Sequence, residues 1–310
     1  MNDSSAEEIS RDYQLLCGSG GDGIVERDVI AVAGPDSARY LQGQLSQDVV
    51  AMAGDSALSF LLGPNGKVDA WLRVHRLDAE NYLLEVDQGW GDVVVTRLKR
   101  FLLRTKATIG EPQRAQLVQR RWSSETIRLG ADVIGDELVV APIGPSAAGV
   151  DLLVLHGADT NVGDLAVDSV SSESLERYRI AHGVPQMGSE LTADTIPGEA
   201  GEWVIDASVS FTKGCYTGQE LVARIDSRGN NVPHPIRLLV LGADAAVGDE
   251  VLLDGATVGA LTSVTPALGA GLPALALARV GRSVAAGGDV TVQSGSVVAP
   301  ASVVEPGSVR

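Results

Sequence analysis

The chain of 310 residues is 45% hydrophobic and 21% charged, with a net charge of −16. This length and composition predict a globular protein of two or three domains and exclude a largely disordered chain, and no apolar run is long enough to span a membrane. The net charge opposes direct binding to a nucleic acid backbone, although an acidic surface also serves plain solubility.

The cysteines and histidines form no recognisable metal or disulfide pattern. Cys17 and Cys215 lie far apart in the chain, no Cys-x-x-Cys pair occurs, and the four histidines are scattered. We therefore expect free thiols and no metal bound by this chain alone. The first residues have neither the basic nor the apolar stretch of a secretion signal, which predicts a cytoplasmic protein.

Residues 1–23 are polar and end in a glycine-rich run, which predicts a mobile arm. A domain with the order β-α-β-β-β-α follows at residues 24–114, which is an α+β arrangement. Its hairpin is predicted from period-two alternation on both sides of an Asn-Gly turn, with one buried face. The predicted strands are 29–32, 57–62, 68–75 and 82–86, and the helices begin near residue 35 and span 90–104.

A second α+β domain is predicted at residues 115–234 and a small β-barrel at residues 235–310. The second domain combines short strands with one clear helix that ends at the capping glycine of His182-Gly183. The last part alternates short strands with turns, as all-β barrels do. The strands expected in these two domains are 127–129, 138–140, 151–155, 236–241, 250–253 and 275–278, and the helix is 173–181.

The segment at residues 213–220 carries the strongest chemical signal. An ammonium near a thiol favours the thiolate, which makes Cys215 and Lys213 candidate catalytic residues. Taken alone, a single cysteine is also compatible with a small buried apolar residue. The rest of the segment supplies conformationally free glycines, an aromatic ring, an amide and a carboxylate: Gly214, Tyr216, Gly218, Gln219 and Glu220.

This segment resembles the Lys-Gly-Cys-(Phe/Tyr)-x-Gly-Gln-Glu signature of the YgfZ-type proteins, which are related to the glycine-cleavage T-protein and to a mitochondrial iron–sulfur assembly factor. The resemblance covers most of the chain except the N-terminal arm and parts of residues 115–165. Further matching blocks are residues 41–49, 179–188, 197–199, 255–265 and 277–280, with Arg224, Arg228 and Gly229 after the signature.

The resemblance implies three domains around a central channel that binds a reduced folate such as tetrahydrofolate. It also implies a role in the assembly or repair of iron–sulfur proteins, with folate and iron–sulfur enzymes or assembly proteins as partners, and thereby an indirect role in tRNA methylthiolation. It does not say which reaction Cys215 performs. A tetrahydrofolate-dependent aminomethyltransferase and a non-catalytic folate-binding scaffold are the alternatives.

The aminomethyltransferase alternative depends on an aspartate pair that follows a glycine turn in the T-protein. When the glycine turns are aligned, that pair falls on Ala70 and Trp71 of this chain, and only Asp69 lies nearby. Side chains alternate faces along a strand, so Asp69 points away from where Ala70 points unless a bulge shifts the register. This mismatch weakens the transferase interpretation.

A folate site needs an aromatic or apolar slot, a carboxylate for the donor-rich edge of the pterin and cations for the glutamate tail. Glu199 fits the carboxylate role through its match to the family block. Arg224 or Arg237 could bind the tail and Trp71 could form the slot, although a surface arginine and a core tryptophan are ordinary alternatives. Cys17 is either an incidental residue or a mobile partner of the other thiol.

Overall fold

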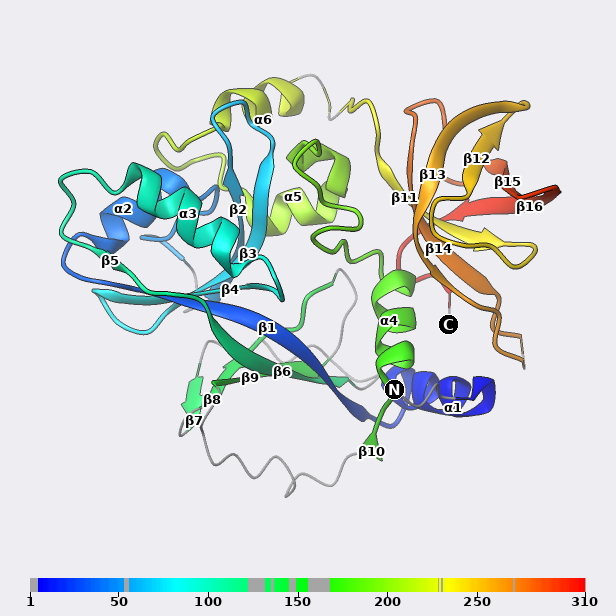
Figure 1. Cartoon of the computed structure of the whole chain (residues 1–310), viewed down its shortest axis with the longest axis horizontal. Helices are drawn as coiled ribbons and strands as arrows, with labels where there is room; N and C mark the ends of the chain where they lie inside the picture. The colour runs from blue at the N-terminus through cyan, green and yellow to red at the C-terminus, as the bar shows by residue number, and fades with distance from the viewer. Residues whose placement is uncertain are drawn as a thin grey trace.

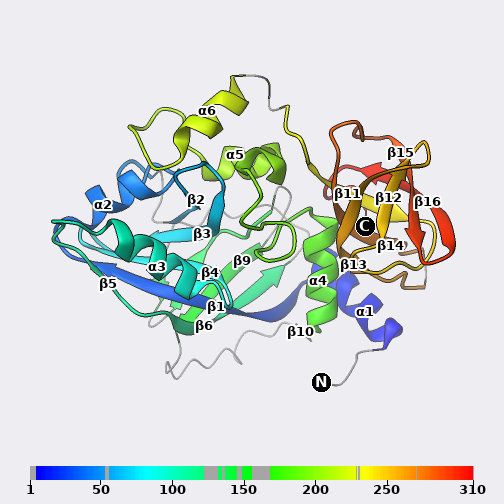
Figure 2. The same ribbon diagram turned by 45° about the horizontal axis from the view of Figure 1, so that its top comes forward.

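The computed structural model describes residues 5–52, 56–121, 132–134, 137–144, 149–155, 168–227, 229, 231–269 and 271–309. The strand expected at 127–129 and Arg228 lie outside these residues. Figures 1 and 2 show a large sheet region that carries most of the helices and a separate C-terminal barrel, with α4 (Ser172–Ala181) between them. No helix in the described part of the chain combines the length and apolarity needed to cross a membrane.

A sheet of ten strands forms the N-terminal part of the molecule. It runs β2-β3-β4-β1-β6-β9-β8-β7, with β5 and β10 also paired to β1. The long β1 pairs with β4 and with β6, so the sheet continues across the expected boundary at residue 114. The strands are β1 (Gly21–Ala33), β2 (Ser56–Leu62), β3 (Val68–Arg76), β4 (Asn81–Asp87), β5 (Thr108–Ile109), β6 (Gln113–Arg121), β7 (Asp132–Ile134), β8 (Glu137–Val140), β9 (Gly149–Leu155) and β10 (Asp168–Ser169).

The expected hairpin is confirmed as the antiparallel pair β2–β3, but the prediction of a single buried face is wrong. Arg73 and His75, on the face expected to meet solvent, are 3% and 0% exposed. Glu85 of β4 offsets the cost of burying these two polar side chains, because its carboxylate lies 2.9 Å from Arg73 Nε and 3.0 Å from His75 Nε2. Burial alone would raise the pKa of Glu85, but its ion pairs with Arg73 and Arg27 hold it well below the usual value. A compensated network of this kind allows polar side chains to be buried.

Residues 6–17 form helix α1 (Ala6–Cys17) rather than a mobile arm. A capping box starts the helix, with the Ser5 hydroxyl accepting from the Glu8 N–H at 3.2 Å and the Glu8 carboxylate accepting from the Ser5 N–H at 2.8 Å. Tyr13 and Leu16 are each 1% exposed, because α1 packs against α4. The average polarity of the segment hid this amphipathic face, so the arm prediction is wrong for these residues.

The remaining helices lie mostly over the sheet, and α2 and α3 cover one apolar core together (Figure 1). Leu41, Val94 and Leu98 face that core and are completely buried. The amphipathic helix expected at 90–104 is confirmed as α3, although it ends three residues earlier. The helices that follow α1 are α2 (Ser37–Gln44), α3 (Gly91–Phe101), α4, the 3-10 helix η2 (Pro197–Ala200), α5 (Glu202–Ser208) and α6 (Gln219–Asp226).

The predicted C-terminal barrel is confirmed as a closed barrel in the order β11-β14-β13-β12-β15-β16. The buried Arg177 of α4 fixes it to the rest of the molecule, because its guanidinium donates to the carbonyls of Pro266 at 3.0 Å and Pro273 at 2.8 Å. The barrel strands are β11 (Ile236–Leu241), β12 (Glu250–Leu253), β13 (Ala256–Thr265), β14 (Ala274–Val280), β15 (Asp289–Ser294) and β16 (Val297–Val304).

Candidate functional site

The side chain of Lys213 joins the signature segment to the C-terminal end of α2. Its ammonium donates to the backbone carbonyls of Gln42 at 2.6 Å, Leu45 at 2.7 Å and Gln47 at 2.8 Å. Carbonyls at the end of a helix have no partner within the helix, so they are suited to accept from a cation. Burial lowers the pKa of Lys213 to about 8. The lysine therefore acts as a clamp between two segments that are far apart in sequence.

The signature segment also packs against the turn between β2 and β3 through closely fitted glycines. Gly218 has a φ of 81°, and a Cβ there would lie 2.6 Å from the carbonyl oxygen of Gly63. On the turn itself, Gly66 has a φ of 78°, and its Cβ would lie 2.5 Å from Cβ of Leu221. Positive φ and the close approach of two backbones both require glycine at these positions.

Cys215 lies exposed between these two anchors. A Cβ added to the neighbouring Gly214 would meet nothing within 4 Å, whereas Tyr216 is 9% exposed and donates its N–H to Oε1 of Gln219 at 3.1 Å. The three hydrogen bonds described for the Lys213 ammonium all go to carbonyls, so the structure does not direct that cation at the thiol. The segment displays an exposed thiol on a loop that is anchored on both sides.

The second thiol belongs to another part of the molecule. Cys17 is the last residue of α1, and α1 lies at the opposite end of the molecule from α6, which begins just after Cys215 (Figures 1 and 2). Because Cys17 is held in a packed helix, it is not a mobile partner for the thiol of the signature segment.

A central cavity of about 490 Å³ lies between the sheet and α4. Trp71 of β3 and Tyr178 of α4 contribute its aromatic surfaces, and Leu117 and Leu175 contribute apolar ones. The indole of Trp71 is held in place because its Nε1 donates to the hydroxyl of Ser208 at 2.9 Å. The volume and the mixed apolar and aromatic lining are typical of a small-molecule site.

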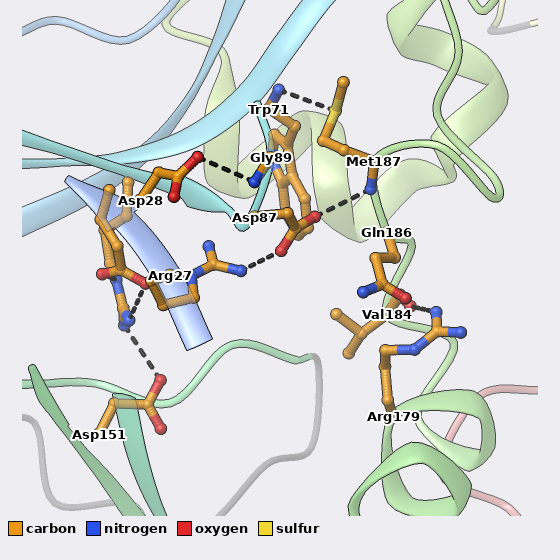
Figure 3. Close-up of polar contacts among 12 residues, drawn as sticks. Arg27, Asp28, Trp71, Asp87, Gly89, Asp151, Arg179, Val184, Gln186 and Met187 are labelled. Atoms are coloured by element: carbon orange, nitrogen blue, oxygen red, sulfur yellow. Dashed lines mark hydrogen bonds and ion pairs between the residues drawn. The ribbon is translucent and has the colours of Figure 1, made fainter. Parts of the chain in front are cut away.

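Charged side chains fix one side of this cavity (Figure 3). Arg27 of β1 is paired with Asp87 of β4, and the same carboxylate accepts from the N–H of Met187 at 2.9 Å. On α4, Arg179 donates to the carbonyl of Val184 at 2.6 Å. The loop from Val184 to Met187 is thereby anchored both to the sheet and to the helix, which preorganises the wall of the cavity.

A second cavity of about 530 Å³ lies between α5 and the C-terminal barrel. Trp203 of α5 lines it, and the rings of Trp71 and Trp203 meet edge to face with centroids 6.2 Å apart. Arg237 also lines it, and its buried Nε has no hydrogen-bond partner among the described residues, as is true of Arg121 Nε at the central cavity. Aromatic faces and unpaired arginine N–H groups fit a ligand with a flat ring system and an anionic tail.

Comparison with known proteins finds relatives by sequence similarity. It is 28% identical, over 66% of its length and 53% of the relative's, to the mitochondrial iron-sulfur cluster assembly factor IBA57 homolog of Pyricularia oryzae. It is also 28% identical, over 64% of its length and 65% of the relative's, to the tRNA-modifying protein YgfZ of Klebsiella pneumoniae. The chain is related to the YgfZ and IBA57 proteins. It thus spans less than two thirds of these relatives, and no model of a protein family matches it.

The fold of the chain agrees with that relationship. The solved structure of the glycine cleavage system aminomethyltransferase T of Bartonella henselae superposes with a TM-score of 0.78, at 15% identity, over 96% of this chain and 89% of that chain. This confirms the expected YgfZ- and T-protein-like fold, with α+β elements followed by a β-barrel.

Asp69, the aspartate near the glycine turn, lies outside the central cavity. The pairing of β2 with β3 shifts between Val68 and Ala70, so Asp69 is the extra residue of a β-bulge. Asp69 lines a third cavity, between α3 and the β2–β3 turn, and pairs with Arg97 at 3.1 Å. Burial raises the pKa of Asp69. The sequence neither predicted nor excluded a bulge here, and the structure contains one. Trp71, not Asp69, lies at the central cavity.

The predicted folate residues are divided among several places. Trp71 lines the central cavity and Arg237 the second one, but Glu199 is 1% exposed in η2 and is ion-paired with Arg279 at 2.8 Å. Arg224 lies on α6, where it lines a fourth cavity of about 430 Å³ beside the signature segment. The folate roles of Glu199 and Arg224 stay predictions, and no described cavity unites the four residues.

Sequence reasoning missed the charged wall of the central cavity. Arg27 and Asp87 lie directly opposite each other on β1 and β4, just beyond the ends of the expected strands at 29–32 and 82–86. Their opposite charges at the ends of two strands were the available signal, since such pairs stabilise antiparallel neighbours. The sequence also did not show which side of the helix at 173–181 is buried, so it did not indicate that Tyr178 lies at the cavity.

Proposed function

We propose that this protein binds a reduced folate, tetrahydrofolate, in the central cavity and acts in the assembly or repair of iron–sulfur proteins. Through those proteins it would support tRNA methylthiolation indirectly, with iron–sulfur enzymes or assembly proteins as partners and the cytoplasm as its location. The names of the relatives support the process, because one is an iron-sulfur cluster assembly factor and another a tRNA-modifying protein.

The observation that carries the folate proposal is the aromatic lining of the central cavity, whose Trp71 meets Trp203 of the second cavity edge to face. A pterin ring would stack between Trp71 and Tyr178, where burial of flat aromatic surface favours binding. The carboxylates of Glu26 and Glu176 line the same cavity and could accept from the donor-rich edge of the ring. The glutamate tail would reach the unpaired Nε of Arg237 in the neighbouring cavity.

A second candidate, tetrahydrofolate-dependent aminomethyl transfer, is supported by the fold that the chain shares with aminomethyltransferase T. The residues favour it less. Asp69 is the extra residue of the bulge and is ion-paired with Arg97, so no aspartate from that turn lies at the central cavity.

Isothermal titration calorimetry with tetrahydrofolate under anaerobic conditions tests folate binding, which both functions require. We expect saturable binding at one site and no formation of methylene-tetrahydrofolate when an aminomethyl donor is added. Turnover of the donor would favour the transferase, and absence of folate binding would overturn the proposal.

Substitution of Trp71 localises the site. We expect Trp71→Ala to weaken tetrahydrofolate binding at least tenfold, because the substitution removes one of the two aromatic faces. Trp71→Phe is the matched control, since it also removes the hydrogen bond to Ser208 but keeps an aromatic face at this position. Equal affinity of wild type and Trp71→Ala would place the folate elsewhere.

Replacement of Cys215 separates a chemical role from a scaffold role. The thiol is exposed, so Cys215→Ala should leave the folded protein and its folate affinity unchanged. In a bacterium that lacks its own YgfZ, complementation with this variant should give low tRNA methylthiolation if the thiol reacts. Full complementation would favour the non-catalytic scaffold.

A further inference from the structure

Residues 97–106, at the end of α3 and in the loop that follows, concentrate positive charge. We call this stretch the basic segment. It contains no aspartate or glutamate, in a chain that has 40 acidic and 24 basic residues. Its five cations are Arg97, Lys99, Arg100, Arg104 and Lys106.

Three cations of the basic segment have no ion-pair partner among the described residues. Arg97 is turned inward, where it pairs with Asp69, and Lys99 pairs with Glu111. Arg100, Arg104 and Lys106 are exposed and form no ion pair in the described part of the chain. Their charges are therefore available to a partner.

The same stretch exposes large apolar side chains. Leu103 is 81% exposed and Phe101 is 37% exposed, and Val93 on the preceding turns of α3 is 38% exposed. Single exposed apolar residues are ordinary, but three of them beside unpaired arginines form the composition typical of a binding interface.

The loop that carries Leu103 has a defined conformation. Leu103 donates its N–H to the carbonyl of Phe101 at 2.9 Å, and Lys106 donates its N–H to Asp36 Oδ2 at 2.8 Å. Between them Arg104 has a φ of 55°, a left-handed conformation that costs a residue other than glycine roughly 1–2 kcal/mol. The loop thus keeps an apolar side chain in solvent at a cost, which points to a function for its shape.

A cavity of about 680 Å³ opens beside the basic segment. Val93 and Phe101 of α3 and Pro64 of the β2–β3 turn give it apolar walls. Its charged lining consists of Arg97 paired with Asp69, of Arg100 and of Asp92. A pocket of this kind accepts one apolar side chain of a partner, and arginine and aromatic residues around it are the common determinants of affinity.

We propose that the basic segment and this cavity bind an acidic segment of a partner protein, with one apolar side chain of that segment inserted between α3 and the β2–β3 turn. The unpaired Arg100 and Arg104 would pair with the partner's carboxylates. Charge complementarity favours a protein segment over a nucleic acid, because three unpaired cations on a chain of net charge −16 hold few phosphates. The cavity favours it over a flat membrane surface.

Two synthetic hexapeptides with blocked ends test the proposal. Each has a leucine–phenylalanine centre, flanked on both sides by two acidic residues in one peptide and by two lysines in the other. In NMR titrations of the full chain at 50 mM NaCl, we expect the acidic peptide to shift amide signals of α3, of residues 101–106 and of the β2–β3 turn. The lysine peptide should bind at least tenfold more weakly, and 300 mM NaCl should weaken the acidic peptide severalfold.

Charge reversal supplies the control. The double variant Arg100→Glu, Arg104→Glu should lose the acidic peptide and gain the lysine peptide, whereas Arg282→Glu, which changes an exposed arginine of the barrel region, should behave as wild type. Phe101→Ala should weaken the acidic peptide without reversing the preference. The proposal is overturned if neither peptide shifts these signals, if both bind equally, or if a 12-nucleotide oligouridylate or phosphatidylserine vesicles bind these residues more tightly.

Discussion

Replacement of Lys213 by methionine distinguishes the clamp seen in the structure from the thiol-activating role expected from the sequence. Lys213→Met keeps the length of the side chain and removes three hydrogen bonds to backbone carbonyls. Hydrogen bonds to a charged group contribute about 1.5–3 kcal/mol each. Burial opposes this gain and lowers the pKa of Lys213 from 10.5 to about 8, but water screens part of that cost because the side chain is only partly buried. We therefore expect a net loss of about 3 kcal/mol in the free energy of unfolding.

Urea denaturation measures this loss, and Lys67→Met is the matched control. Lys67 is paired with Asp194 at the surface, with side chains 37% and 81% exposed, so its replacement should cost less than about 1 kcal/mol. In parallel, the pH dependence of alkylation of Cys215 by iodoacetamide should be the same in wild type and Lys213→Met, both in a Cys17→Ala background. Unchanged stability combined with slower alkylation near neutral pH would refute the clamp and restore the activating role.

Two further predictions concern stability. Gly218→Ala should destabilise the protein by about 2 kcal/mol or more, because its Cβ would lie 2.6 Å from the carbonyl oxygen of Gly63. Gly214→Ala should be nearly neutral, because its Cβ would meet nothing within 4 Å. Equal effects of the two substitutions in thermal unfolding would contradict the packing of the signature segment. Burial lowers the pKa of His75 in the folded chain. Below about pH 6.5 this histidine is therefore protonated in the unfolded chain but not in the folded chain, and the free energy of unfolding falls as the pH decreases. His75→Gln should remove up to about 1.4 kcal/mol per pH unit from that slope between pH 6.5 and 5, and an unchanged slope in urea titrations would show that another group carries it.

The sequence predicted the elements whose signals are local. The hairpin around the Asn65-Gly66 turn, the helix that ends at His182-Gly183 and the closed barrel after residue 235 all follow from periodicity and turn residues. These signals depend on a few neighbouring residues, so no knowledge of the rest of the chain is required. The resemblance of residues 213–220 located a segment that the structure anchors at both ends.

The sequence failed where distant residues compensate one another. Arg73 and His75 were assigned to a solvent face because each is polar, yet Glu85 makes their burial possible. The direction of Asp69 depended on a one-residue bulge, which period-two alternation cannot reveal. In the same way, Lys213 was paired with its sequence neighbour Cys215, although its partners lie about 170 residues earlier in the chain.

The contacts of Lys213 change what can be asked of the exposed thiol. An ammonium that donates to three carbonyls has used the three donors of its head group, so it has no N–H left to offer a thiolate. The loop around Cys215 therefore presents an exposed sulfur that Lys213 does not activate. If the thiol reacts, a group other than Lys213 must take its proton.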